Sequence, residues 1–133
     1  APLRAALTPP TDGSGAAARA GPGAGAGASA VEVLVEVPFL MRDDDHLVEG
    51  VIDRVVLHRA PDGTVERADV LDWKTDAVRS DDAAALNAKV DYYAPQLHRY
   101  AHAVERLYGV ALGRITARLA FLAAGEMCEV PLD

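Results

Sequence analysis

Two aliphatic runs joined by an Asp-Gly turn constrain this chain more than any other feature. The runs cover residues 47–58 and 64–73, and residues 60–63 between them read Ala-Pro-Asp-Gly. Both runs are rich in Val, Ile and Leu, and the glycine occupies the turn position that favours a positive φ. The pattern therefore predicts an antiparallel hairpin, and with it a β-sheet.

Each strand of this predicted hairpin carries an aspartate among apolar residues. Asp53 lies in the first strand, and Asp72 lies near the end of the second, two residues before Lys74. An ionised carboxylate is costly in such surroundings unless it binds a cation or a hydrogen-bond donor. Residues two apart on a strand point to the same face, and the hairpin brings both acids toward the same end of the sheet. The three side chains are thus predicted to form a site for a divalent metal and a water.

Lysine is a rare residue in this chain, which gives position 74 more weight. Of the thirteen basic residues, only Lys74 and Lys89 are lysines. A lysine offers a compact ammonium whose pKa can be tuned, which an arginine does not. An Asp-x-Lys pair by itself is more often a solvated surface ion pair, so its interpretation depends on the motifs around it.

Three further segments have the pattern of strands. Valine alternates with glutamate or leucine over residues 31–37, and Pro38 then marks an edge strand or its end. Residues 114–123 and 127–132 predict a fourth and a fifth strand. With one helix between the third and fourth strands, the order of elements indicates a mixed sheet with helical cover, an α/β sandwich.

The helix is predicted from apolar residues that recur every three or four positions between Tyr93 and Tyr108. Proline is tolerated in the first turn of a helix, so Pro95 places the expected start within residues 91–94. Gly109 is expected to end the helix.

Gln96 and Tyr100 are four residues apart on this predicted helix, so they share one face, one turn apart. Taken alone, Tyr100 would be interpreted as a core aromatic residue and Gln96 as a solvated one. Their position just after the Asp-x-Lys strand makes a functional role the better interpretation.

The order of these motifs carries a family resemblance. Gly-x-Ile-Asp-Arg-Val, an Asp-Gly turn, Asp-Trp-Lys-Thr and then Gln-x-x-x-Tyr on a helix together resemble the RecB-like branch of the PD-(D/E)xK nucleases. Within that branch the chain is most similar to the C-terminal nuclease domains of UvrD-type helicases in the AddAB, AdnAB and RecBCD machines. The resemblance covers about residues 32–130.

This resemblance implies a restriction-endonuclease-like fold, an α/β mixed sheet flanked by helices. It implies a Mg²⁺- or Mn²⁺-dependent deoxyribonuclease, an exonuclease that hydrolyses unwound single strands during double-strand-break processing and recombinational repair. The roles it implies are metal binding by Asp53, Asp72 and the backbone carbonyl of Trp73, orientation of the attacking water by Lys74, and DNA positioning by Gln96 and Tyr100.

Composition restricts how such a domain could work. The net charge of −7 argues against a free-standing nucleic-acid binder, because affinity for phosphates comes from clustered Lys and Arg. We therefore expect a helicase motor in the same polypeptide to hold the DNA and to use ATP, in a subunit that could belong to a heterodimeric helicase-nuclease. Cys128 is alone, so an intrachain disulfide is excluded. No apolar run approaches the ~20 residues that span a membrane, and a cytoplasmic location is expected.

Residues 1–30 differ in character from the rest. They are rich in Ala, Gly and Pro without apolar periodicity, which predicts a linker or a disordered insertion before a nuclease domain at residues 31–133. Relatives usually begin with a helix that often carries an acid completing the metal site, and nothing before Val31 resembles it. The alternative is therefore a catalytically inactive scaffold that guides DNA or docks a subunit.

Overall fold

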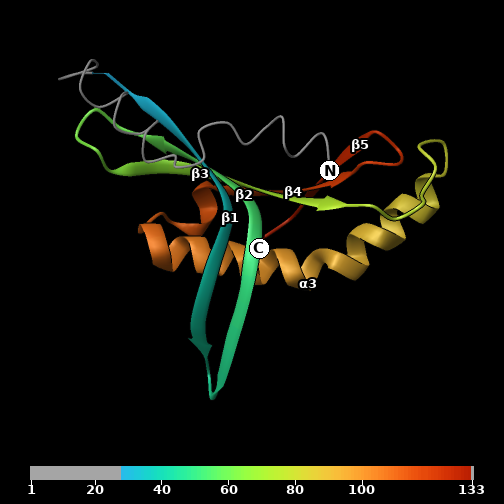
Figure 1. Cartoon of the computed structure of the whole chain (residues 1–133), viewed down its shortest axis with the longest axis horizontal. Coiled ribbons are helices and arrows are strands. Elements are labelled where there is room, and N and C mark those ends of the chain that lie inside the picture. The colour runs from blue at the N-terminus through green and yellow to red at the C-terminus, as the bar shows by residue number, and fades with distance from the viewer. Residues whose placement is uncertain (1–27, 133) are drawn as a thin grey trace.

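The computed structural model describes residues 28–132, in which five strands form one mixed sheet (Figure 1). The strands lie across the sheet in the order of the sequence; β3 and β4 are parallel, and the other neighbours are antiparallel. The elements are β1 (Ala30–Asp43), β2 (His46–Arg59), β3 (Val65–Lys74), α3 (Ala83–Tyr108), the short 3₁₀ helix η1 (Leu112–Arg114), β4 (Ile115–Phe121) and β5 (Glu126–Val130). The predicted hairpin, the later strands and the α/β class are confirmed.

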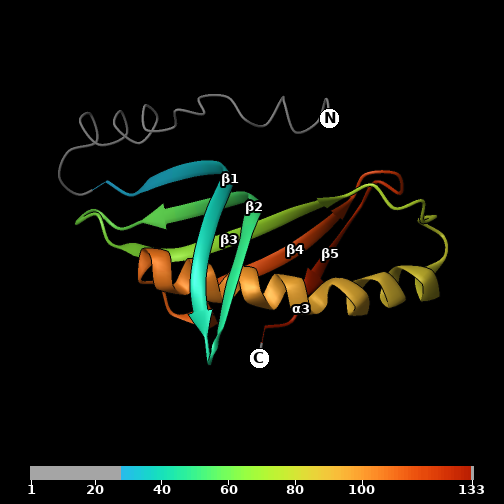
Figure 2. The ribbon, with the colours of Figure 1, turned by 60° about the horizontal axis from the view of Figure 1, so that its bottom comes forward.

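Helix α3 connects the two parallel strands and covers one face of the sheet, as Figure 2 shows. A parallel pair needs a long connection, and a helix is the usual one. The apolar side of α3 buries Leu97, Ala101 and Val104 against strand residues such as Leu57 and Leu119. No helix in the described part of the chain is long and apolar enough to cross a membrane.

Helix α3 begins earlier than expected, at Ala83, so the prediction of a start within residues 91–94 is wrong. Asp82 caps the first turn, where its side chain accepts a hydrogen bond from the Ala85 N–H at 3.0 Å. Leu86 in the early turns is buried in the core, and that burial stabilises a helical segment that the apolar pattern after Tyr93 does not include.

Pro95 lies inside α3. Its ring cannot donate to the carbonyl of Asp91, but both residues are exposed, so water can hydrate the freed carbonyl. The predicted end of the helix is confirmed, because Gly109 caps it in the left-handed conformation with φ 67°.

The distal part of the β1–β2 hairpin, residues 37–52, forms an arm that crosses α3 (Figures 1 and 2). β1 pairs with β2 as far as the tip, whereas the pairing of β2 with β3 begins only at Arg54. Pro38 therefore lies within an edge strand and does not end it. Glu36, just before the arm, has a positive φ of 51°, and Phe39 on the arm packs edge-to-face on Tyr100 of α3, with ring centres 5.7 Å apart.

The other face of the sheet carries a small second cluster of Leu71, Trp73 and Ala120. A cavity of about 310 Å³ adjoins it, and Arg54 contributes to its lining. The indole N–H of Trp73 is buried there without a hydrogen-bond partner. Because side chains alternate along β3, this cluster lies on the face opposite the Asp72 side chain.

Gly50 is required where the arm meets the helix. A Cβ at this position would lie 2.9 Å from both Cε1 and Cζ of Phe39 and 3.5 Å from Cε1 of Tyr100. We expect Gly50→Ala to lower the free energy of unfolding by about 1–3 kcal/mol, because the buried Phe39 ring must move. Gly113→Ala is the matched control, since nothing lies within 4 Å of its added Cβ. Urea unfolding of both variants would measure this, and equal effects would contradict the packing argument.

Candidate active site

Two carboxylates lie close together at the end of the β2–β3 pairing. Arg54 pairs with Leu71, so Asp53 and Asp72 occupy the next step along the two strands. The Oδ2 atom of Asp53 accepts a hydrogen bond from the backbone N–H of Trp73 at 2.8 Å. This bond holds Asp53 against the end of β3, beside Asp72.

Asp72 is the only buried charged or polar residue in the described part of the chain, with 4% of its surface exposed. The Lys74 Nζ atom lies 2.9 Å from its Oδ2. This ion pair offsets part of the cost of burying the carboxylate, and Asp53 is the second charged group that contacts it. A buried carboxylate next to a second carboxylate is suited to a cation, because a cation offsets both the desolvation and the repulsion between the two charges.

The surroundings of Asp72 oppose its ionisation. Desolvation, together with the neighbouring Asp53, raises the pKa of Asp72 from 3.8 to about 6, although Lys74 acts in the opposite direction. Burial also raises the pKa of Tyr100 to about 12, with help from the negative charges of Asp72 and Asp53. Tyr100 is therefore close enough to the carboxylates to sense their charge.

Lys74 is held from three sides. Besides its ion pair with Asp72, its Nζ donates a hydrogen bond to Oε1 of Gln96 at 2.8 Å. The same Nζ lies 3.9 Å from the centre of the Tyr93 ring, a cation–π contact. Lys74 belongs to β3, whereas Gln96 and Tyr93 belong to α3. The packing of the helix on the sheet therefore positions the ammonium.

A second group of side chains supports Tyr93. Its hydroxyl donates to both carboxylate oxygens of Asp76 at 3.0 Å, and Asp76 forms an ion pair with Lys89 at 3.0 Å. Although desolvation opposes it, the interactions with Lys89 and Tyr93 lower the pKa of Asp76. Both lysines of the chain thus belong to one network.

The structure brings together five of the six residues assigned from sequence. Asp53, Asp72 and Lys74 form one cluster, Gln96 contacts the lysine, and the Trp73 peptide bonds to Asp53. The Tyr100 ring is nearby but buried against Phe39, and it contributes through packing. Sequence reasoning missed Tyr93, Asp76 and Lys89. The available signal was Lys89, because it is one of only two lysines in the chain.

The cluster can supply two carboxylate ligands to a metal ion. Within residues 28–132, no group of three or more His, Cys, Asp or Glu side chains is close enough to hold one. Mg²⁺ is usually bound by one or two carboxylates and keeps several waters, so the donor set of Asp53 and Asp72 fits such an ion. The burial of Asp72 beside Asp53 supports the same assignment.

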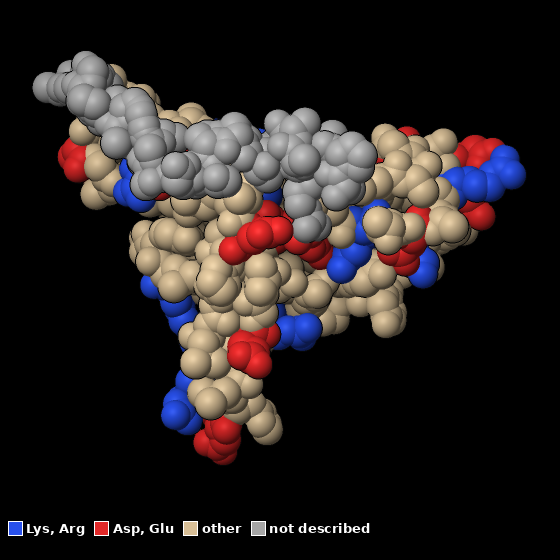
Figure 3. All heavy atoms as spheres, viewed as in Figure 1, with Lys and Arg blue, Asp and Glu red and all other residues tan. Residues whose placement is uncertain are grey.

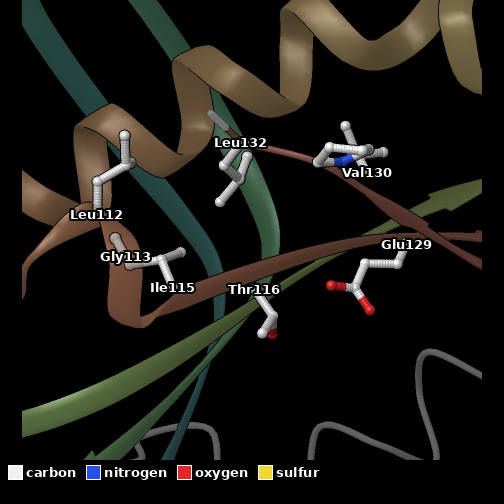
Figure 4. Close-up of a pocket in the computed structure, with 8 residues that line it drawn as sticks. Leu112, Gly113, Ile115, Thr116, Glu129, Val130 and Leu132 are labelled. Atoms are coloured by element: carbon white, nitrogen blue, oxygen red, sulfur yellow. The ribbon is translucent and has the colours of Figure 1, made fainter.

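A separate cavity of about 310 Å³, shown in Figure 4, lies at the other end of β4. Ile115 and Thr116 at the start of β4 line it, whereas Lys74 pairs with Phe121 at the far end of that strand. Glu129 is its one acidic lining residue among those described. The cavity is therefore distinct from the carboxylate cluster and lacks its chemistry.

Comparison with known protein families adds one finding. The family model described as the PD-(D/E)XK nuclease superfamily matches residues 16–129. No curated protein is similar enough in sequence to match the chain. The family match includes residues 16–27, which lie outside the described part, so the interpretation of residues 1–30 as a linker or insertion stays a prediction.

The raised pKa of Asp72 predicts that the metal-free chain loses stability as the pH rises. The pKa of this carboxyl is 3.8 in the unfolded chain and about 6 in the folded chain, so the folded state binds more protons between these pH values. The free energy of unfolding should therefore decrease over this interval, and Asp72→Asn should lack that part of the decrease. Denaturant unfolding at several pH values, with a chelator present, would test it.

Asp69 on the same strand provides the matched control. Despite desolvation, hydrogen bonds from Thr116 and His58 lower the pKa of Asp69, so Asp69→Asn should remove a trend of the opposite sign, in which stability is lost as the pH falls. Identical pH profiles for the unaltered chain and Asp72→Asn would contradict the assignment of Asp72.

Proposed function

Because this chain belongs to the PD-(D/E)XK nuclease superfamily, we propose that it is a divalent-metal-dependent deoxyribonuclease domain. The observation that carries the proposal is the convergence of Asp53, Asp72 and Lys74 at one end of the sheet, with Gln96 of α3 bound to the lysine. This set combines ligands for a hard cation with one positive group beside them, which is what phosphodiester hydrolysis needs.

The two carboxylates would hold Mg²⁺ or Mn²⁺, and the Trp73 carbonyl is proposed as a further ligand because the peptide on its N-terminal side is bound to Asp53. The ion, when bound, supplies a coordinated water of lowered pKa and neutralises charge on the phosphate. The chain itself supplies the fixed geometry of these ligands.

Lys74 has the second role, since its ammonium lies beside Asp72 and can both orient a water and stabilise negative charge on phosphate oxygens. Gln96 and Tyr93 restrict its rotamers, so little reorganisation is needed when charge develops. A histidine base is unnecessary in this scheme.

We further propose that the domain works on single strands delivered by a helicase motor in the same polypeptide, where ATP would be used, during double-strand-break repair. Two observations support a separate source of DNA affinity. The net charge is −7, and basic and acidic side chains are interspersed on the described surface that Figure 3 shows, without a continuous basic patch there. A heterodimeric helicase-nuclease remains the proposed setting.

The second candidate function is a nuclease-like scaffold without catalysis, which guides DNA or docks a subunit. The observation that favours it is that the described residues place no third acidic side chain beside Asp53 and Asp72, whereas relatives often have one on their first helix. The two candidates make opposite predictions about metal-dependent cleavage.

Metal binding is the first expectation. Calorimetric titration with Mn²⁺ should show one site, and Asp72→Ala should weaken binding by at least about tenfold, because one of two carboxylate ligands is lost. Asp69→Asn, on the opposite face of the same strand, should leave the affinity unchanged. Equal Mn²⁺ affinity in Asp72→Ala and the unaltered chain would contradict the assignment of a metal to this site.

Cleavage is the second expectation. With Mn²⁺ and single-stranded DNA, Lys74→Ala should lower the rate constant by about 100-fold or more while metal binding and fold persist, because one electrostatic contact in the transition state is lost. Lys89→Ala removes the same charge at a position separated from Lys74 by Tyr93 and Asp76, so it should cost far less. Asp53→Ala should abolish cleavage. Cleavage that persists in Asp53→Ala would favour the scaffold.

A further inference from the structure

Tyr92 is the most exposed large apolar residue that the structure describes, with 73% of its surface in contact with solvent. Single exposed aromatic residues are common on proteins, so exposure alone gives no function. The position of this ring is more informative. It lies on α3 one turn before Gln96, the residue that holds Lys74.

Two contacts connect Tyr92 to the candidate active site. Its ring centre lies 4.9 Å from that of Tyr93, and the two rings are nearly perpendicular, at 78°. Tyr93 in turn lies 3.9 Å from Nζ of Lys74. Only the Tyr93 ring therefore separates Tyr92 from the Lys74 ammonium. One or two nucleotides of a DNA strand can span that distance.

The Tyr92 ring is also supported. Tyr93, on which it packs, is itself anchored by the hydrogen bonds of its hydroxyl to Asp76. An aromatic ring that is held in place while it is exposed loses little conformational entropy when a planar group stacks on it. The support distinguishes Tyr92 from an aromatic side chain that is free to rotate in solvent.

We propose that Tyr92 is a stacking platform for an unpaired nucleobase of the strand whose phosphate binds at Asp53, Asp72 and Lys74. The proposal rests on the proposed nuclease function, and it adds a binding site for the substrate base. Stacking is available to every base because each has a π face, so the contact is tolerant of sequence. The faces of bases in a duplex are covered by their neighbours, so the platform favours single strands.

The surroundings of Tyr92 fit a nucleic-acid strand better than a protein partner. On α3, the only other exposed large apolar residue is Leu107, about four turns away, so the helix offers no continuous apolar patch. Gln96 and Arg99 follow Tyr92 on the same helical stripe, and Arg99 is exposed. Arg99 lies about two turns, roughly 10 Å, beyond Tyr92 along the helix. Single-strand binding surfaces combine stacking rings with cations that follow the backbone, so Arg99 is placed to contact a neighbouring phosphate.

The test is a short single-stranded oligonucleotide that contains 2-aminopurine, whose fluorescence changes when it stacks on an aromatic ring. It would be titrated with excess chain at low ionic strength, where the weak binding expected of the domain alone is detectable, and with a chelator present so that no cleavage occurs. We expect the unaltered chain and Tyr92→Trp to change the fluorescence. Tyr92→Ala should lose that change and bind roughly 5- to 150-fold more weakly, the range for one base–aromatic stack.

Two controls separate stacking from a general loss of binding. Leu107→Ala, an exposed apolar residue on the same helix, should behave as the unaltered chain does. The same oligonucleotide in a duplex should show no dependence on residue 92. An unchanged fluorescence response in Tyr92→Ala, an equal dependence with the duplex, or no response from the unaltered chain would each overturn the proposal.

The outcomes distinguish this proposal from the proposed function. A Tyr92-dependent response in a chain that never cleaves DNA would support the platform and reject the nuclease. Cleavage of single strands that is equally efficient in Tyr92→Ala, with KM and kcat both unchanged, would reject the platform and leave the nuclease in place.

Discussion

The burial of Asp72 at the end of β3 is the constraint on which the site depends. An ionisable carboxyl with only 4% of its surface exposed is expensive to desolvate, and its raised pKa reflects that cost. Lys74 offsets part of the cost from the same strand, and Asp53 adds a like charge that increases it. A structure that tolerates two neighbouring carboxyls here is prepared for a further cation.

The placement of α3 turns this charge cluster into an ordered site. The arm, residues 37–52, crosses the helix and packs Phe39 on Tyr100, and near the tip Arg106 donates a hydrogen bond to the carbonyl of Arg42 at 2.6 Å. The helix therefore packs between the arm and the sheet, and in this position Gln96 and Tyr93 contact Lys74. Long-range packing therefore sets the position of the ammonium, and the close fit of Gly50 against Phe39 is part of that packing.

Sequence reasoning succeeded where local rules dominate. The hairpin follows from an Asp-Gly turn between aliphatic runs, and the shared face of Asp72 and Lys74 follows from the two-residue period of a strand. It failed at the start of α3. The apolar period and the preference of proline for the first turn of a helix indicated a start near Pro95, whereas the helix begins after Asp82, which caps it. It also missed the Tyr93–Asp76–Lys89 network, whose members belong to a loop and two different turns of a helix.

The sequence by itself determined the order of elements, the hairpin that aligns Asp53 with Asp72, and the choice of residues that suit a metal-dependent nuclease. These depend on turn chemistry and on side-chain periodicity, which act over a few neighbouring residues. Only the tertiary structure decided that Asp72 is buried, that Gln96 and Tyr93 contact Lys74, and that Tyr92 is exposed beside them. Those features arise from the packing of α3 on the sheet and under the arm, between residues far apart in the chain, where no local pattern carries the information.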